Sequence, residues 1–189
     1  MNTQENKKSL EKKLIDDLSS IDIKSISTKE INFFHNKAIL ITGASGIIGL
    51  NLLFFFYKIS REKKIKITID GTYNSYLFNF VKKYFNKNKK VNFIKIDLTT
   101  RKIKNNKKYD LVFHCAGYGQ PSKFLRYKTS TYKLNSNVLM DLSNKLKMKG
   151  RFIYMSSTEI YSGNKKLCTE ESNGFTSTNH PRSTYIESK

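Results

Sequence analysis

Residues 38–49 read Ala-Ile-Leu-Ile-Thr-Gly-Ala-Ser-Gly-Ile-Ile-Gly and indicate the architecture of the whole chain. The first four residues are apolar without alternation, as expected of a strand buried on both faces of a parallel sheet. Gly43, Gly46 and Gly49 follow, and then an apolar stretch over residues 50–57 that suits a helix. Strand, glycine turn and helix in this order are typical of a dinucleotide-binding loop.

Each glycine of this loop has its own structural reason. Gly43 permits the tight turn, Gly46 lets the backbone approach a pyrophosphate, and Gly49 lets the helix pack close to the strand. The helix N-terminus offers free N–H groups and a positive dipole end to phosphates. The spacing is Gly-x-x-Gly-x-x-Gly, not the Gly-x-Gly-x-x-Gly of the larger dehydrogenases. A glycine-rich turn that only reverses the chain is the alternative interpretation.

A dinucleotide site also needs an acidic residue about 20 positions later, at the end of the second strand, to bond the ribose hydroxyls. Residues 65–69 are typical of that strand, and Asp70 is expected to end it. A carboxylate there favours NAD over NADP, because it repels a 2′-phosphate. If the strand runs on through residues 71–73, the position falls to Asn74 and the preference for NAD loses its support.

The rest of the chain alternates helix and strand patterns. This alternation predicts an α/β fold, a Rossmann-like, doubly wound parallel sheet with helices on both faces, over residues 37–189. We expect a helix over residues 77–85 and strands over 91–96 and 111–113. A long helix is expected over 129–147, closed by Gly150. A strand over 151–155 and a polar loop over 164–180 follow.

Residues 1–36 are expected to form a helical extension. Leu10, Leu14, Ile15 and Leu18 have helical spacing, and Ser27-Thr28 has the residue types that cap a second, short helix. We expect the extension to pack against the domain or a partner, and it carries no residues that suggest chemistry.

Tyr185 and Lys189 stand four residues apart near the end of the sequence, which places them on one face of a helix. An ammonium group one turn from a phenol favours the phenolate and lowers its pKa, so such a pair can exchange a proton with a sugar hydroxyl. The spacing alone is weak, since it arises by chance in a Lys-rich chain.

Further segments occur in a recognisable order between the glycine loop and this pair. They are Asp97-Leu98, His114-Cys-Ala-Gly117, Asn135 and Ser156-Ser-Thr-Glu-Ile-Tyr161. With them, the chain from about Lys37 to Lys189 resembles the extended short-chain dehydrogenase/reductase family, which comprises NAD-dependent sugar-nucleotide epimerases, dehydratases and decarboxylases. Residues 181–189 resemble the corresponding segment of UDP-glucuronate decarboxylases, so we expect the chain to stand closest to those members.

The resemblance implies a role for each motif residue. The catalytic group would be Ser157, Tyr185, Lys189 and Glu159, with Thr158 as the neighbour that could be confused with Ser157. NAD would be held by Gly43, Ser45, Gly46, Ile47, Ile48, Gly49, Asp70, Asp97, Leu98, Ala116, Gly117, Asn135, Tyr185 and Lys189. The substrate side would be lined by Tyr118, Gly119, Gln120 and Ser157.

The implied reaction begins with a UDP- or dTDP-linked sugar. Tyr185 would take the proton of the C4 hydroxyl while hydride passes to NAD. The 4-keto sugar could then lose a carboxylate, eliminate water, or turn its other face to the cofactor before the hydride returns. The alternative is a cofactor-binding module or truncated fragment without turnover. Family members are roughly twice the size of one such domain. We therefore expect a C-terminally truncated chain that lacks the substrate lobe, and a homodimer for the full-length form.

Composition excludes several other classes. The 189 residues suffice for one domain, with 35 Lys and Arg against 15 acidic residues and a formal net charge of +20. The lysines are dispersed and no nucleic-acid motif is present, so we expect no specific nucleic-acid partner. Cys115 and Cys168 are too few for a disulfide framework or a zinc site, and no metal is expected. Glycines and polar residues interrupt the apolar stretch 38–57, which argues against a membrane span. The polar N-terminus favours a cytoplasmic enzyme.

Overall fold

A five-stranded parallel sheet forms the centre of the protein, whose computed structural model describes residues 3–86 and 88–189. Its strands are β1 (Lys37–Thr42), β2 (Ile67–Tyr73), β3 (Val91–Lys95), β4 (Tyr109–His114) and β5 (Leu146–Tyr154). Their order across the sheet is β3-β2-β1-β4-β5, and every neighbouring pair is parallel. The predicted doubly wound α/β fold is confirmed.

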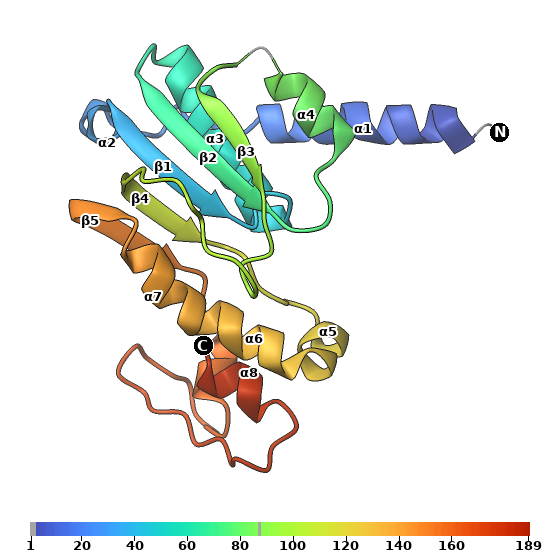
Figure 1. Cartoon of the computed structure of the whole chain (residues 1–189), viewed down its shortest axis with the longest axis vertical. Coiled ribbons are helices and arrows are strands. Elements are labelled where there is room, and N and C mark those ends of the chain that lie inside the picture. Colours follow the sequence, from blue (N-terminus) through green and yellow to red (C-terminus); the bar gives the residue numbers. More distant parts are fainter. Residues whose placement is uncertain (1–2, 87) are drawn as a thin grey trace.

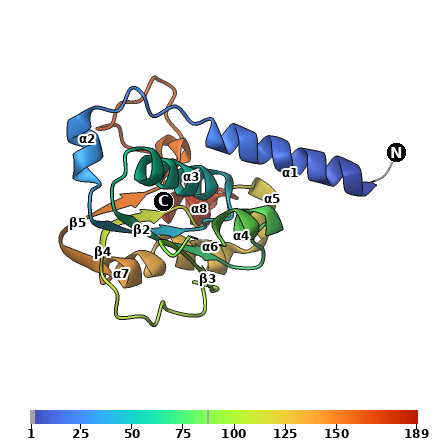
Figure 2. The ribbon, with the colours of Figure 1, turned by 90° about the horizontal axis from the view of Figure 1, so that it is seen from above.

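Helices cover both faces of the sheet (Figures 1 and 2). On one face lie α1 (Thr3–Ser19), α3 (Ile47–Glu62) and α4 (Asn79–Phe85), and on the other lie α6 (Lys128–Asn135) and α7 (Asn137–Ser143). The central strand divides its side chains accordingly: Ile39 and Ile41 pack toward the first group of helices and Leu40 toward the second. Because all three side chains are fully buried, β1 reads as a continuous apolar run.

The N-terminal extension is built into the larger of the two cores. Helix α2 (Thr28–Phe33) begins at a capping box, in which Ser27 and Glu30 satisfy each other's backbone N–H groups. Leu18, Ile23 and Ile31 are buried in the same cluster as the residues of α3. The two predicted helices are therefore present, and the extension packs against the sheet domain.

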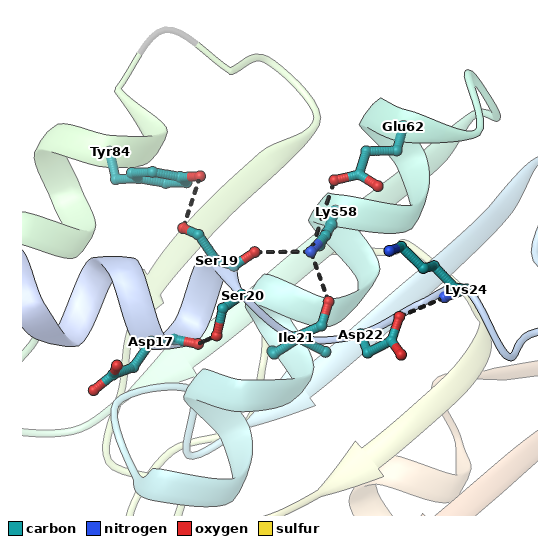
Figure 3. Close-up of polar contacts among 9 residues, drawn as sticks. All are labelled: Asp17, Ser19, Ser20, Ile21, Asp22, Lys24, Lys58, Glu62 and Tyr84. Carbon is teal, nitrogen blue, oxygen red and sulfur yellow. Dashed lines mark hydrogen bonds and ion pairs between the residues drawn. The ribbon is translucent and has the colours of Figure 1, made fainter.

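A lysine of α3 fixes the point where α1 ends (Figure 3). The Lys58 ammonium donates to the backbone oxygens of Ser19 at 2.9 Å and Ile21 at 2.6 Å, and its nitrogen lies 3.8 Å from a Glu62 carboxylate oxygen. The last carbonyl groups of a helix have no partners within the helix. Lys58 supplies one from a neighbouring helix and so ties the extension to α3.

The long helix predicted over residues 129–147 is wrong in two respects. The helical stretch is broken at Ser136, whose φ of −130° and ψ of −70° lie outside the helical region, so that α6 and α7 are separate. It ends at Ser143, and β5 begins at Leu146 opposite Tyr109. Gly150 lies within an irregular part of β5 and does not close a helix.

Three short helical elements complete the fold. They are α5 (Pro121–Arg126), the 3₁₀ helix η1 (Thr158–Tyr161) and α8 (Ser183–Glu187). Helix α8 and the irregular chain before it lie beyond the carboxyl edge of the sheet, beside α6 (Figure 1). Over the described residues, no helix is long and apolar enough to cross a membrane.

Candidate functional site

A cleft of about 470 Å³ opens at the carboxyl ends of β1, β2, β3 and β4. It lies where the chain leaves β1 and β4 toward opposite faces of the sheet, which is the usual position of ligands in open α/β sheets. Residues from four segments line it: 43 and 45–47, 72–75, 96–99, and 115–120, with Lys123 and Leu134. The glycine loop, the Asp97-Leu98 segment and the segment after β4 thus share one cavity.

The glycine loop needs its glycines because backbone closes around it. Gly43 has a φ of +66°, and a β-carbon there would lie 2.8 Å from the backbone of Ala116. A β-carbon on Gly49 would collide with the carbonyl oxygen of Gly43. Gly46 precedes the first turn of α3, whose free N–H groups face the cleft region. Close backbone packing beside the cleft therefore requires these glycines, and the N-terminus of α3 that follows them suits a phosphate.

The expectation that Asp70 ends the second strand is wrong. Strand β2 continues to Tyr73, which pairs with Lys95 of β3, so Asp70 lies in mid-strand. Its carboxylate is buried, accepts a 2.6 Å hydrogen bond from the Tyr109 hydroxyl and lies 2.9 Å from the Lys107 ammonium. Burial and the Asp70 carboxylate both raise the pKa of Tyr109. Asp70 does not line the cleft, and the residue that follows β2 there is Asn74.

Most of the other residues assigned to the cofactor surround the cleft. Ser45, Ile47, Asp97, Leu98, Ala116 and Gly117 line it. Asp97 is tied to its own loop, because one carboxylate oxygen accepts from the N–H of Thr99 at 2.9 Å and from its hydroxyl at 2.7 Å. Ile48 is about half exposed beside the loop and is not part of the cleft wall.

His114 forms a buried relay that sequence reasoning did not single out. Its Nε2 lies 2.8 Å from the carbonyl oxygen of Leu134, which can only accept, so Nε2 carries the proton. The neutral ring then accepts at Nδ1 from the Thr42 hydroxyl at 2.7 Å, and Thr42 accepts from the N–H of Ala116. Burial lowers the pKa of His114 to about 4. The relay joins β1, β4 and α6 behind the cleft wall.

Tyr185 and Lys189 lie next to each other, but not on one continuous helix. Helix α8 ends at Glu187, and the Lys189 ammonium donates to the Met155 carbonyl oxygen at 2.7 Å. The same ammonium lies 5.8 Å from the ring centroid of Tyr185 and 4.7 Å from that of Tyr154. Burial holds the pKa of Lys189 below its usual value. The cation is therefore held between two aromatic faces and a carbonyl oxygen.

The Tyr185 ring is fixed from its other side by Phe124 of α5. The two rings are stacked, with centroids 4.2 Å apart and planes at 14°. Tyr118, at the wall of the cleft, packs against this pair. Gln120 also lines the cleft and directly precedes α5. The residues expected on the substrate side thus connect the cleft to Tyr185.

Ser157 and Glu159 lie at the start of η1, which contacts α8. The Ser157 hydroxyl accepts from the N–H of Glu159 at 3.2 Å. The Glu159 carboxylate accepts a 2.9 Å bond from the Arg182 guanidinium, and both side chains are partly exposed. Glu159 therefore has a cationic partner from the segment that leads into α8.

The side-chain oxygen of Asn135 is a buried acceptor near Gly117 in the cleft wall. Asn135 is buried, its amide donates to Ser188 at 3.1 Å, and its Oδ1 has no hydrogen-bond partner among the described residues. A β-carbon added to Gly117 would lie 3.7 Å from that oxygen and 4.0 Å from the Lys189 nitrogen. Asn135, Gly117 and Lys189 therefore converge at the end of the cleft.

Comparison with protein families identifies this arrangement. Residues 39–189 match the model of the NAD dependent epimerase/dehydratase family. The chain belongs to this family. Its members are NAD-dependent, as the name states, and the match spans every motif from the glycine loop to the terminal Tyr185–Lys189 pair. A search of curated proteins finds no match.

Solved structures share the fold at low sequence identity. An epimerase from Methanothermobacter thermautotrophicus superimposes with a TM-score of 0.61 at 20% identity, over 88% of this chain and 49% of its own. The UDP-N-acetylglucosamine 4-epimerase of Methanobrevibacter ruminantium gives 0.60 at 20%, over 82% and 47%. The UDP-Glc/GlcNAc 4-epimerase of Campylobacter jejuni gives 0.60 at 19%, over 81% and 46%. The chain spans about half the length of these proteins.

The site fits the dinucleotide of the family on physical grounds. The glycine loop brings the N-terminus of α3 to the cleft, and Asn135 holds a buried acceptor with no partner among the described residues. Phosphates suit the helix N-terminus at one end of the cleft. The buried acceptor and the Lys189 ammonium suit a polar group at the other end.

Proposed function

We propose that this chain provides the cofactor half and the proton-transfer residues of a nucleotide-sugar epimerase, dehydratase or decarboxylase. The observation that carries the proposal is the convergence of Lys189, Asn135 and Gly117 at the end of the glycine-loop cleft, with the Tyr185 ring centroid 5.8 Å from the Lys189 nitrogen. A cofactor cleft and a phenol near an ammonium group within one fold suit the oxidation of a secondary hydroxyl, which we assign to C4 of the sugar.

Each group of residues has its own role in this proposal. NAD, when bound, supplies the hydride chemistry. Its phosphates would be held by the loop at Gly43 and Gly46, and its adenosine by the wall that contains Asp97. Tyr185 takes the proton of the substrate hydroxyl, with the Lys189 nitrogen 5.8 Å from the centroid of its ring. Ser157 orients the same hydroxyl.

The substrate class rests on the family and on its neighbours. The Methanobrevibacter enzyme is described in complex with UDP-N-acetylmuramic acid, and a dTDP-glucose dehydratase is also among the matches, at a TM-score of 0.53. We therefore propose a UDP- or dTDP-linked sugar. Among the three reaction types, we propose that Glu159 bears on the choice, because a carboxylate beside the sugar can serve in acid–base steps. Exchanging it for Gln would then change product distribution more than cofactor binding.

NAD titration of this chain by calorimetry tests the cofactor assignment. Binding in the micromolar to millimolar range is expected. Loss of binding in Ile47→Glu, with retention in Met148→Glu, would locate NAD at the loop, since both side chains are exposed and only Ile47 lines the cleft. Absence of binding at millimolar NAD would refute the proposal for this chain.

Turnover is tested with Tyr185→Phe in a chain that includes a substrate-binding region. The variant is expected to bind NAD normally and to lose turnover by at least about a hundredfold. Turnover at the wild-type rate would remove Tyr185 from its role.

The second candidate function is a cofactor-binding module without turnover. It is favoured by one observation: the cleft is lined by the glycine loop but not by Ser157, Tyr185 or Lys189. NAD binding together with the absence of NAD reduction by any of a panel of UDP- and dTDP-sugars would support it. For the full-length form we also propose a homodimer, with Tyr132 and Met140, which are exposed on α6 and α7, in its interface. Sedimentation of wild type and Met140→Glu tests that interface.

A further inference from the structure

The end of β2 presents no carboxylate to the cofactor cleft. In dinucleotide-binding folds an acidic side chain at this place bonds the ribose 2′-hydroxyl and repels a 2′-phosphate. Here the cleft wall after β2 consists of Tyr73, Asn74 and Ser75. The side chains at the ribose position therefore carry no formal charge. They do not repel a 2′-phosphate, which is the group that distinguishes NADP from NAD.

The acidic residue closest in sequence is withdrawn from this role. Asp70 has 4% of its surface exposed, lies three residues before the end of β2, and is engaged by Tyr109 and Lys107. Bringing it to the cleft would require breaking a buried 2.6 Å hydrogen bond and a partly buried ion pair. A buried carboxylate that lost these partners would be strongly destabilising, so Asp70 stays where it is.

Among the described residues, the cleft wall contains one carboxylate, and it comes from the segment after the next strand. Asp97 follows β3, and one of its oxygens is occupied by the N–H and hydroxyl of Thr99. Lys123 supplies a cation to the same wall. The formal charges of Asp97 and Lys123 cancel, so the lining as a whole does not oppose an additional phosphate.

Asn74 has the chemistry to accept either form of the ribose. Its side chain is exposed at the cleft, and an amide offers both an acceptor and two donors. The acceptor suits a 2′-hydroxyl, and the donors suit a 2′-phosphate. The neighbouring Ser75 hydroxyl has the same dual character.

We propose that Asn74 makes the cleft permissive, so that this chain binds NADP with an affinity comparable to that for NAD. The inference rests on the proposed cofactor site and concerns its selectivity. It follows from the placement of Asn74 and Ser75 at the ribose position and from the sequestration of Asp70.

The test compares NAD with NADP by calorimetry on the whole chain. The two dissociation constants are expected to lie within about tenfold of each other, since no unpaired carboxylate opposes the phosphate. Competition by adenosine 2′,5′-bisphosphate and by AMP isolates the ribose contact, because these probes differ only in the 2′-phosphate. Repeating the titration at about 0.5 M salt separates local contacts from the long-range attraction of a chain with a net charge of +20.

Two variants assign the effect to a residue. Asn74→Asp is expected to weaken NADP by about tenfold or more while leaving NAD within about threefold, since a carboxylate close to a phosphate repels it. Asp70→Asn is the matched control and should leave the ratio unchanged, with its fold checked by circular dichroism.

The outcomes separate the two proposals. NAD binding with NADP weaker by more than about a hundredfold overturns the permissive site and leaves the cofactor assignment standing. An unchanged ratio in Asn74→Asp removes Asn74 from the site. Failure of both dinucleotides to bind refutes the cofactor assignment, and the inference about its selectivity falls with it.

Discussion

Protonation of His114 is predicted to destabilise the protein as the pH falls from 6.5 toward 4. The ring is 1% exposed, and burial lowers its pKa to about 4 from an unperturbed value of 6.5. Between these values the unfolded chain binds a proton that the folded chain does not, so the free energy of unfolding decreases as the pH falls. Above pH 6.5 both states are neutral at this site, and below pH 4 both are protonated.

The size of the effect follows from the difference of about 2.5 pKa units. At 1.36 kcal/mol for each unit, the full contribution is about 3 kcal/mol, and about 2 kcal/mol of it is lost between pH 6.5 and 5. The structural cause is burial, which disfavours the charged imidazolium, and the Lys189 ammonium adds to it. Protonation also disturbs the hydrogen bonds of the ring. A protonated Nδ1 can no longer accept from Thr42, and Thr42 is the acceptor for the N–H of Ala116.

Urea unfolding at pH 7.5 and pH 5.0 measures this contribution. Wild type is expected to lose about 2 kcal/mol more between the two pH values than His114→Gln, which does not titrate. His35→Gln removes an exposed histidine and serves as the control. His114→Asn provides a second non-titrating variant if the glutamine disrupts packing. Equal pH dependence in wild type and both His114 variants would refute the argument.

Three further perturbations test other parts of the structure. Gly49→Ala should destabilise the protein by about 1–3 kcal/mol through overpacking against the preceding turn, measured by thermal unfolding. Lys58→Met should cost about 1–2 kcal/mol in urea by leaving the end of α1 unpartnered, whereas the exposed Lys66→Met should cost almost nothing. Tyr109→Phe should cost about 1–3 kcal/mol because it removes a hydrogen bond to the buried Asp70, with NAD affinity unchanged. A parallel fall in NAD affinity would show that Asp70 does reach the cofactor.

The glycine loop and the alternation of strands with helices were sufficient to predict the fold. Both signals are local: an apolar run such as residues 38–41 and a glycine turn are visible within a dozen positions. The segments that meet at the cleft were also predictable, because the carboxyl ends of parallel strands share one edge of the sheet.

The sequence predicts two element boundaries wrongly, the end of β2 and the end of the helix after β4. Both boundaries are set by strand pairing between segments that are distant in the sequence. The sequence places Asp70 at a strand end because it directly follows the three isoleucines of residues 65–69, whereas β2 continues as long as β3 offers partners, up to Lys95. The helix predicted over 129–147 is too long because Leu146 pairs with Tyr109, so that residues from Leu146 onward form β5. Neither pairing can be read from local propensity.

The His114 relay was missed for a different reason. His114 was recognised only as part of a motif, and its role depends on Thr42 and Leu134, which lie 72 and 20 positions away. A polar residue at the end of a buried strand is the one signal that pointed to it, since a buried polar side chain needs partners.

The place where the family resemblance begins differs from the place where the folded unit begins. The match starts at residue 39, whereas Leu18, Ile23 and Ile31 already belong to the core that supports α3. Lys58 reaches back from α3 to the end of α1. An expression clone limited to residues 39–189 would expose the apolar surface of α3, the helix that follows the glycine loop. Such a clone is expected to aggregate, and its failure would say nothing about the active site.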